Sequence, residues 1–483
     1  MGHPRALILL AFGWGCSPAA PKPYGEVLLN VDTNVTVPRL ASELRVDSYA
    51  EDGTWFDSRA IGLPDAPSWP VSFSVYSADE TRETWVWVRL RAFSNGAVRD
   101  YRGERFTTVE GPAPVPEGEQ PRLTKDGVDV TPQEEPLPAL SVDRLLRVRL
   151  APGNRGTVSV LLDGSCAGRM AFLGELAPGV SSSCIAGQDT VALDAERSAG
   201  IQAAKETLAG TWGEPCESAR EGNRICVPGG GTILGSRELL LYPGLPPTPE
   251  RVMYLSRFWV DEREMSVARF RAALAQGFAP ANMPTENPGA LGPDYVQNGC
   301  TWSTTPNGRE GYALNCVSQV TARALCQFLG GDLPTEAQWE YMATSAGRNE
   351  RMPFPWGTAQ PECERAVYGR LPLSGVAGVC QSLGTGPVPL DEGPGDVTPL
   401  GIFGLAGGMS EWTRDTYADY GAPCWKQAPL ANPECSGPGA NVSMRGGNWA
   451  TPPTILRSAS RLGTSAQGKA SFIGFRCAYP GAA

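Results

Sequence analysis

The sequence predicts an α+β protein, with β-sandwich-like segments in its N-terminal part and an irregular, disulfide-stapled C-terminal part. Short runs of alternating apolar and polar residues, typical of half-buried strands, occur between residues 24 and 193. Helix-start signals follow at Ser266 and Thr335, and nine of the 13 cysteines lie beyond residue 222. The 57 glycines and 44 prolines among 483 residues predict long loops and short strands.

The first 16 residues resemble the signal of a bacterial lipoprotein. Arg5 precedes an apolar run at residues 6–12, and small residues precede Cys16. In that family the cysteine receives a diacylglyceryl group and becomes the first residue of the mature chain. We therefore expect lipidation at Cys16, with ordinary cleavage or a buried cysteine as the alternatives. The lipid would be the only membrane contact.

This signal implies an exported protein of the bacterial cell envelope. Ser17 after Cys16 favours, by analogy, an outer-membrane lipoprotein that faces the periplasm or the cell surface. No apolar run approaches the roughly 20 residues that a membrane helix needs.

The first folded unit is expected over residues 24–108. Aliphatic residues alternate with tryptophan and then arginine over residues 85–92, which gives this strand one aliphatic face and one aromatic, then basic, face. Asp-Gly at 52–53 and Asn-Gly at 95–96 are two-residue hairpin signals. Together these patterns predict a small β-sandwich of immunoglobulin-like size.

Three further segments precede the C-terminal domain. Residues 109–139 contain almost no large apolar side chains and are expected to be a Pro/Glu-rich linker. Alternating strands then flank a Pro-Gly-Asn turn within a small β segment at 140–193. A polar, partly helical connector is expected at 194–222. Whether the two β segments form one domain or two stays open.

The cysteine count supports an oxidising compartment. Without Cys16, 12 cysteines remain, which is an even number that could form six disulfides. Five pairs are near neighbours, and the remaining two cysteines would close a loop of about 150 residues. The sequence does not prove which cysteines pair, but it favours structural disulfides over catalytic cysteines. The suggested pairs are Cys166 with Cys184, Cys216 with Cys226, Cys300 with Cys316, Cys363 with Cys380, Cys424 with Cys435, and Cys326 with Cys477.

Charge and histidine content exclude several classes of function. The net charge is −10 and Lys and Arg form no block, so nucleic acid is not an expected partner. The one histidine is His3, inside the predicted signal. The mature chain would therefore lack the imidazole that Ser-His-Asp and Cys-His sites, HExxH zinc sites and the 2-His-1-carboxylate iron triad need.

Two helices are predicted in the C-terminal part. Thr335 and Gln338 form a capping-box pattern, so a helix should start after Pro334 and carry Trp339 into the core. After Ser266, apolar residues at 267, 270, 273 and 274 have helical spacing.

An ordered series of motifs carries a family resemblance over residues 223–480, more than half of the chain. The motifs are VPGGG (227–231), FWVDEREMSVARF (258–270), LPTEAQWEY (333–341), FPWG (354–357), EW (411–412), RGGNW (445–449) and IGFRCAY (473–479). This series resembles the formylglycine-generating enzymes, or sulfatase-modifying factors. The resemblance implies an irregular α+β fold related to C-type lectins.

The chemistry of that family is missing from this chain. The family uses two cysteines to bind copper and activate dioxygen, which oxidises a substrate cysteine to formylglycine. Between Arg445 and Arg476 there is no cysteine, and matching backwards from Arg461 places the family's cysteines at Pro453 and Ser458. Neither side chain can replace a thiolate for Cu(I). Copper is not expected, and no residue is assigned as catalytic.

The family's calcium sites are also incomplete. Residues 398–412 match the corresponding motif without a gap and retain Glu411, but Gly404 and Gly408 replace residues with side-chain oxygens. Hard cations need six to eight oxygens, so the site is weakened. Calcium at Glu411 stays a candidate, and pairing of Glu411 with a nearby arginine is the alternative.

Three functions fit these observations. The favoured one is a non-catalytic binding or scaffold module whose lectin-like groove holds a peptide, a glycan or an envelope protein. The groove candidates are Asn448, Trp449, Arg457 and Arg461, with loop support as their alternative role. The second is an active sulfatase-maturation oxidase, or a related enzyme, with a divergent site. The third is a purely structural envelope protein.

Overall fold

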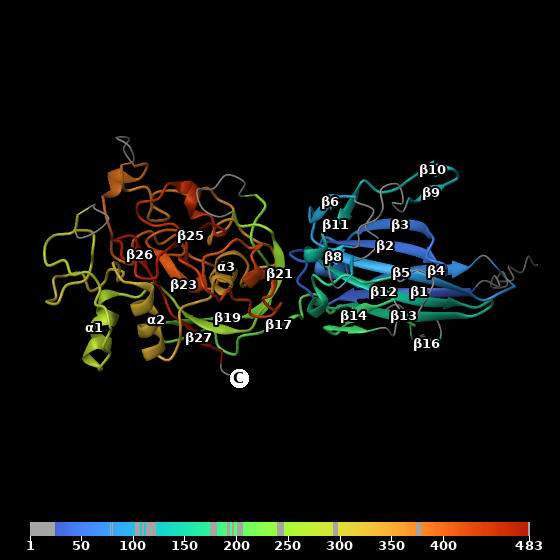
Figure 1. The fold of residues 1–483 in the computed structure, drawn as a ribbon, viewed down its shortest axis with the longest axis horizontal. Helices are drawn as coiled ribbons and strands as arrows, with labels where there is room; N and C mark the ends of the chain where they lie inside the picture. The colour runs from blue at the N-terminus through green and yellow to red at the C-terminus, as the bar shows by residue number, and fades with distance from the viewer. Residues whose placement is uncertain are drawn as a thin grey trace, which may run out of the picture.

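The structure is a computed structural model with two lobes that lie side by side along its long axis (Figure 1). One lobe consists of strands, and the other holds all the described α-helices. The predicted signal and Cys16 lie outside the described residues. The structure describes residues 25–77, 79, 81–101, 107–108, 111–112, 122–173, 181–190, 194–195, 198–199, 206–238, 246–292, 298–372 and 378–481.

The N-terminal lobe, over residues 25–199, is a β-sandwich of two four-stranded sheets. The first sheet has the order β16 (Ser198–Ala199), β13 (Arg155–Leu162), β1 (Gly25–Thr33) and β4 (Val71–Ser77). The second has the order β12 (Ser141–Leu150), β5 (Thr84–Phe93), β2 (Glu43–Ala50) and β3 (Trp55–Gly62).

Both β segments of the sequence contribute to both sheets. β13 runs parallel to β1, with Glu26 opposite Arg155. β12 runs antiparallel to β5, with Ser141 opposite Phe93. The question that the sequence left open is thereby answered, because the segments at 24–108 and 140–193 form one sandwich.

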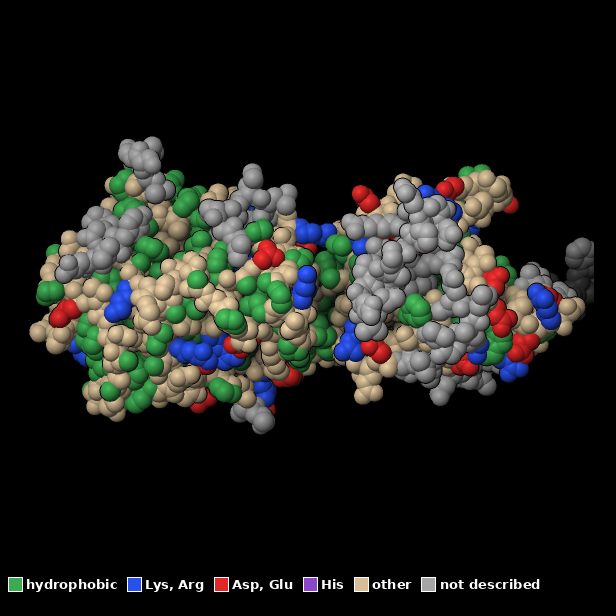
Figure 2. Space-filling model, in the orientation of Figure 1, with side chains coloured by type: hydrophobic (Ala, Val, Ile, Leu, Met, Phe, Trp, Pro, Cys, Tyr) green, Lys and Arg blue, Asp and Glu red, His purple; other side chains and the backbone are tan. Residues whose placement is uncertain are grey.

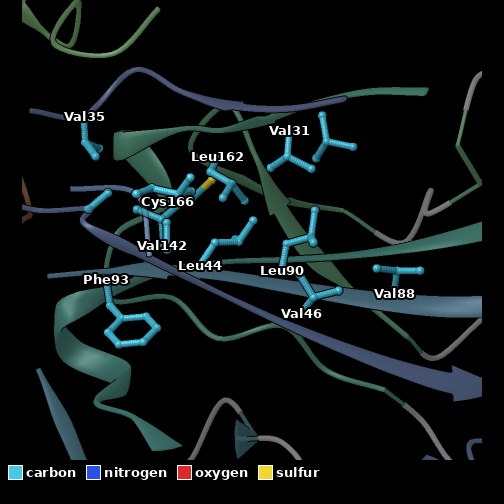
Figure 3. Packing of buried hydrophobic residues seen from close by; sticks show 14 of the residues in the cluster. Val31, Val35, Leu44, Val46, Val88, Leu90, Phe93, Val142, Leu162 and Cys166 are labelled. Atoms are coloured by element: carbon cyan, nitrogen blue, oxygen red, sulfur yellow. The ribbon is translucent and has the colours of Figure 1, made fainter. Parts of the chain in front are cut away.

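The aliphatic faces of the two sheets form the core of the sandwich. Figure 3 shows Val31 and Leu162 from the first sheet meeting Leu44 and Leu90 from the second. All four side chains are buried. The period-two alternation therefore predicted the inward face correctly, since successive side chains point to opposite faces of a strand.

The basic face of β5 is buried as well. Arg89 is 2% exposed and its Nε lies 3.0 Å from Asp143 Oδ1 on β12. The next arginine on this face, Arg91, lies 2.7 Å from Asp47 on β2. Breaking such a buried pair leaves an uncompensated charge at a cost of about 3–5 kcal/mol. The carboxylates on the neighbouring strands are therefore required to balance the buried charges of Arg89 and Arg91.

One of the two hairpin expectations is confirmed and the other is wrong. β2 and β3 pair around the turn at 52–53. At 95–96 the chain does turn, with Gly96 at φ 74°. However, the next strand, β6 (Val98–Asp100), pairs with β11 (Glu134–Pro136) and not with β5. The reason is that β12 and β2 already occupy both edges of β5.

Short two-stranded ribbons surround the main sheets. Part of the predicted linker at 109–139 lies in them. Besides β6 with β11, they are β7 (Thr107–Thr108) with β8 (Gly111–Pro112), β9 (Thr124–Lys125) with β10 (Val128–Asp129), and β14 (Ser183–Ile185) with β15 (Gln188–Thr190). The described residues of the connector at 194–222 hold short strands and no helix, so the partly helical expectation was wrong, because these residues pair with strands of the two lobes.

Within the described residues, the C-terminal lobe, over residues 212–481, has three small sheets and four short α-helices. One sheet has the order β17 (Gly213–Glu214), β20 (Gly229–Leu234) and β21 (Arg251–Leu255). The second has β18 (Arg220–Glu221), β19 (Arg224–Val227), β22 (Phe258–Asp261) and β27 (Ala478–Pro480). The third has β25 (Arg461–Thr464), β24 (Val442–Arg445), β23 (Ser410–Thr416) and β26 (Ile473–Gly474). The helices are α1 (Val267–Ala275), α2 (Gln319–Phe328), α3 (Glu336–Thr344) and α4 (Pro423–Lys426).

Both helix predictions are confirmed. Ser266 caps α1 by accepting a hydrogen bond from the backbone N–H of Arg269. Thr335 and Gln338 form the complete capping box of α3, and Trp339 is fully buried. Each cap satisfies N–H groups that would otherwise lack partners at the helix start.

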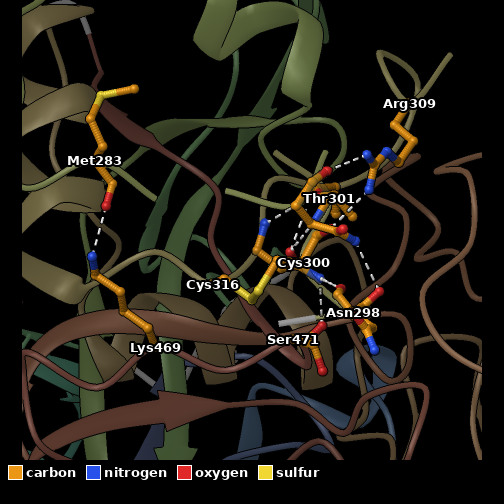
Figure 4. The surroundings of a disulfide bond; sticks show 12 residues. Met283, Asn298, Cys300, Thr301, Arg309, Cys316, Lys469 and Ser471 are labelled. Atoms are coloured by element: carbon orange, nitrogen blue, oxygen red, sulfur yellow. Dashed lines mark hydrogen bonds between the residues drawn. A yellow bond between two sulfur atoms is a disulfide. The ribbon is translucent and has the colours of Figure 1, made fainter. Parts of the chain in front are cut away.

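Six disulfides join the cysteines after Cys16 in the pairs that their spacing suggested. Five of them lie wholly in the C-terminal lobe, where Cys300–Cys316 staples a loop whose carbonyl at Cys300 accepts a hydrogen bond from Arg309 (Figure 4). The pairs are Cys166–Cys184, Cys216–Cys226, Cys300–Cys316, Cys326–Cys477, Cys363–Cys380 and Cys424–Cys435.

Trp212 forms the joint between the two lobes. A Cβ built on Gly164 of the sandwich would lie 2.2 Å from the Trp212 ring, and so would one on Gly231 of β20. Only glycine leaves room for the indole on each side. Beside this joint, Arg39 of the sandwich donates to the carbonyl of Ser345 at 2.7 Å. The lobes are therefore held by direct contacts and not only by the chain between them.

No helix within the described ranges is long and apolar enough to cross a membrane.

Candidate functional site

The loop that follows β24 lies against the interior of the C-terminal lobe. A Cβ on Gly446 would lie 2.6 Å from the carbonyl oxygen of Leu405, and one on Gly447 would lie 2.7 Å from that of Ala406. Glycine is therefore required for this close backbone approach. The loop continues through the 3-10 helix η6 (Pro453–Leu456) into β25.

Three of the four predicted groove residues are buried and do not line an open groove. Asn448 donates to Ser410 Oγ at 2.9 Å, and Trp449 Nε1 donates to a backbone carbonyl at 3.1 Å. Arg461 is fully buried against Glu336. This prediction was wrong, because the loop sequence does not reveal the distant partners that bury these polar groups. Loop support, the alternative role, describes all three.

The positions matched to the family's copper ligands do not fit copper. Pro453 begins η6, and Ser458 is 1% exposed with its backbone N–H donating to the carbonyl of Pro353 at 2.8 Å. All 12 cysteines that follow Cys16 in the sequence are in disulfides. A disulfide sulfur is not a thiolate, and it is the thiolate that binds the metal. The described residues therefore contain no cysteine thiolate that could bind copper.

A buried network of two carboxylates and two guanidinium groups lies under the loop. Glu336 accepts from Arg445 Nη1 at 2.8 Å and from Arg461 Nε at 2.6 Å, and Glu340 accepts from Arg445 Nη2 at 2.7 Å. All four side chains are fully buried. Burial alone would raise the pKa of Glu336, but Arg461 and Arg445 outweigh it and hold this pKa at about 2.

The sequence analysis missed this network. Glu336 and Glu340 lie four residues apart on α3, so they share one face of the helix. That spacing was the available signal for two acids acting together. Their partners could not be found in the same way, since Arg445 and Arg461 lie more than 100 residues further along the chain.

Glu411, the calcium candidate, is held by neighbouring side chains. Its Oε1 lies 2.7 Å from Arg476 Nη2, and its Oε2 accepts from Trp339 Nε1 at 2.8 Å. A cation ligand needs free carboxylate oxygens, whereas a guanidinium group here already supplies the positive charge. The residues at this carboxylate therefore do not fit a calcium ion, and they match the alternative of a paired carboxylate.

Glu264 fills the space beside the two substituted glycines. A Cβ on Gly404 would lie 2.7 Å from Glu264 Oε2, and one on Gly408 would lie 2.8 Å from Oε1. Burial raises the pKa of Glu264 to about 8, so this carboxyl is largely protonated at neutral pH. Burial also raises the pKa of the nearby Asp396 to about 6. A largely protonated glutamate, Glu264, therefore occupies the space where the resemblance placed the two missing side chains.

A cavity of about 390 Å³ opens where the two lobes meet. The sandwich contributes Arg39 and the turn at 94–96, and the C-terminal lobe contributes Arg237, Arg351 and Arg457. Figure 2 shows Lys and Arg side chains on both sides of this junction. Arg457, one of the predicted groove residues, lines this cavity.

The cavity adjoins the loop to which the resemblance assigned the copper ligands. Pro353 lines it and accepts the backbone N–H of Ser458, and Ala459 lines it as well. The β-sandwich thus covers the face of the C-terminal lobe beside this loop.

The C-terminal lobe is therefore a loop-rich, disulfide-stapled α+β domain built around buried arginine–carboxylate pairs. Residues 212–480 match the sulfatase-modifying factor enzyme 1-like domain, and the chain belongs to this family. This confirms the resemblance and its fold class. The β-sandwich lies outside the matched residues.

Several known proteins are similar to this chain. The formylglycine-generating enzyme of Streptomyces coelicolor is 26% identical over 300 residues, which cover 55% of this chain and 92% of that enzyme. Hercynine oxygenase of Mycobacterium tuberculosis is 29% identical over 167 residues, or 34% of this chain and 36% of that protein. The structure of PvdO from Pseudomonas aeruginosa has a TM-score of 0.41 at 18% identity and covers 53% of this chain and 93% of its own.

Proposed function

We propose that this protein is an exported, envelope-anchored and non-catalytic member of the family that acts as a binding or scaffold module. The observation that carries the proposal is the state of the cysteines. The loop between Arg445 and Arg476 contains none, and each cysteine after Cys16 is in a disulfide. A copper site that carries out this oxidation would therefore lack its thiolate ligands in the chain after Cys16.

Two further observations support the proposal. Six disulfides are typical of proteins that fold in an oxidising compartment, which favours export. The buried positions of Asn448, Trp449 and Arg461 remove the groove that we expected from the sequence. The cavity between the lobes takes its place as the binding site, because pockets at domain interfaces are common ligand sites.

The absence of catalysis is tested with a sulfatase-type cysteine peptide. The protein without its signal is incubated with the peptide under copper and oxygen, and mass spectrometry measures conversion to formylglycine. We expect no conversion beyond a protein-free blank, alongside an active formylglycine-generating enzyme as positive control. Conversion above the blank would overturn the proposal and would mean that one of the six cysteine pairs binds copper.

Anchoring is tested separately on the full chain expressed in a bacterial host. Radiolabelled palmitate should enter the protein and should be lost in Cys16→Ser. A variant at a cysteine of the body, Cys216→Ser, serves as the control and should keep the label. Equal labelling of Cys16→Ser and the unaltered chain would contradict a lipid on Cys16.

A further inference from the structure

We infer that the cavity between the two lobes binds a small anionic ligand that presents carboxylate or phosphate oxygens. The inference rests on the proposed binding function and names its ligand class. Four arginines line the cavity, against the two glutamates Glu238 and Glu250. The lining therefore carries an excess of positive charge in a chain whose net charge is −10.

Arg39 is the residue that calls for an anion. It is 8% exposed, and its guanidinium group donates to the carbonyls of Ser345 and Arg348 and to Thr36 Oγ1, at 2.7, 2.6 and 3.2 Å. Within the described ranges no carboxylate pairs with it, and its buried Nε has no partner. Burial, together with the nearby Arg351, lowers the pKa of Arg39 to about 10. A buried cation without a counter-ion is costly, and an anion in the cavity would lower that cost.

The remaining arginines share too few carboxylates to neutralise the lining. Arg237 lies 2.6 Å from Glu250, and Arg351 shares that same carboxylate at 3.5 Å. Arg351 also lies 3.5 Å from Glu340, but Glu340 is the partner of Arg445 in the buried network. One glutamate at the cavity therefore serves two arginines.

Arg457 is the arginine that can turn toward a ligand. Its partner Glu238 lies 2.9 Å away, and the Glu238 side chain is 78% exposed. Exposed ion pairs contribute little to stability, so a ligand oxygen can replace this glutamate. Arg457 and Arg39 come from different lobes, so a ligand between them would contact both.

The geometry favours a small, oxygen-rich anion over other ligands. The planar fork of a guanidinium group matches the two oxygens of a carboxylate or phosphate. The volume of about 390 Å³ is within the range of about 300–1,000 Å³ typical of small-molecule sites. A cation would meet like charges, and an apolar ligand would leave the guanidinium groups without partners.

The test is isothermal titration calorimetry of the complete body with two probes, inorganic phosphate and citrate, at constant ionic strength set with sodium chloride. We expect saturable binding of at least one probe, and the two arms distinguish a phosphate from a carboxylate preference. Arg457→Gln should weaken binding about tenfold, the loss expected for one charge-assisted hydrogen bond. Arg39→Lys, which keeps the charge but loses the fork, should also weaken it.

Arg155→Gln is the matched control, since Arg155 also pairs with a glutamate at the surface, Glu26, but lies on β13 away from the cavity. It should leave the affinity unchanged. The inference is overturned if neither probe binds saturably up to about 10 mM, or if Arg457→Gln and Arg155→Gln bind equally well. The peptide-oxidation assay is independent of this titration, so the two proposals can fail separately.

Discussion

In the β-sandwich, Arg89 and Asp143 meet across two adjacent strands, whereas in the C-terminal lobe Arg461 and Glu336 meet across 125 residues of sequence from a strand and a helix. In the first case the register of β5 and β12 brings the charges together. In the second case no sheet register is available, and the ion pairs themselves join β24 and β25 to α3. The difference shows that the loop-rich lobe depends on side-chain cross-links where the sandwich depends on backbone pairing.

Disulfides extend this contrast, and their removal should have the largest effect. Cys326–Cys477 closes 151 residues, whereas Cys166–Cys184 in the sandwich closes 18. In the chain-entropy estimate, replacing the first pair by serine should cost about 5 kcal/mol and replacing the second about 3 kcal/mol. Urea unfolding followed by tryptophan fluorescence measures both free energies. A larger loss from the sandwich pair would contradict the contrast.

The buried network is expected to give the next largest effect. Glu336→Gln leaves two arginines, Arg445 and Arg461, without their full counter-charge, so it should lower the unfolding free energy by about 4 kcal/mol. In the sandwich, Asp143→Asn leaves one arginine, Arg89, without its counter-charge, so it should lower the unfolding free energy by less. Calorimetry of thermal unfolding measures the loss of stability of each variant in its own lobe.

An exposed pair supplies the control for this experiment. Glu262→Gln removes the partner of Arg220, which is half-exposed, and should change stability by less than about 1 kcal/mol. A loss from Glu336→Gln no larger than this would show that the network does not hold the lobe together.

Glu264 in the C-terminal lobe and Asp47 in the sandwich should make stability depend on pH in opposite directions. Glu264 stays protonated in the folded lobe up to about pH 8 but ionises above its ordinary value of 4.5 when unfolded. The folded state then binds the extra proton, so its stability falls by up to about 1.4 kcal/mol per pH unit as pH rises toward 8. In the sandwich, burial opposes ionisation of Asp47, but Arg91 and Arg45 still lower its pKa below the ordinary 3.8, so its contribution is lost as pH falls through that range.

Glu264→Gln isolates this effect. The variant should lessen the decline in stability of the C-terminal lobe between about pH 5 and pH 8, measured by urea unfolding at each pH. Part of the decline should remain, because burial also raises the pKa of Asp415 to about 8. Glu262→Gln, whose carboxylate lies at the surface, should keep the slope of the unaltered protein. A slope unchanged by Glu264→Gln would mean that this carboxyl is ionised in the folded lobe.

Glycine substitutions should give the smallest difference in lost stability between the two lobes. Gly408 has φ 73° and a Cβ there would meet Glu264, so Gly408→Ala should cost about 2 kcal/mol. Gly53 in the sandwich turn has φ 84° with nothing within 4 Å of a Cβ, so Gly53→Ala should cost only the backbone strain, about 1 kcal/mol. Adding Glu264→Ala should recover part of the loss at Gly408 and none at Gly53.

Local patterns predicted the parts of this fold that depend on neighbouring residues. The capping box at Thr335 and the alternation along β5 are set within a few positions, and the structure confirms both. The pairing of β1 with β13 depends on residues 129 apart, and nothing in either strand identifies its partner. The hairpin expected at 95–96 failed for this reason.

The same limit applies to the candidate site. The missing thiols could be recognised from the sequence, because an absent residue type does not depend on folding. The burial of Arg461 could not, since arginine is usually exposed and the partner Glu336 is distant in the sequence. The cavity was also beyond reach, because Arg39 and Arg457 come from different lobes.

The central positions of β1 and β5 in their sheets determine when the sandwich can close during synthesis. β1 lies between β4 and β13, and β5 lies between β2 and β12. Until residues 141–162 leave the ribosome, each of these strands has one open edge, and open apolar edges recruit other chains. The open edges of a nascent chain therefore need shielding over that interval. A translation product that stops before residue 141 lacks β12 and β13, so it should be bound by chaperones or degraded and should not fold into part of the sandwich.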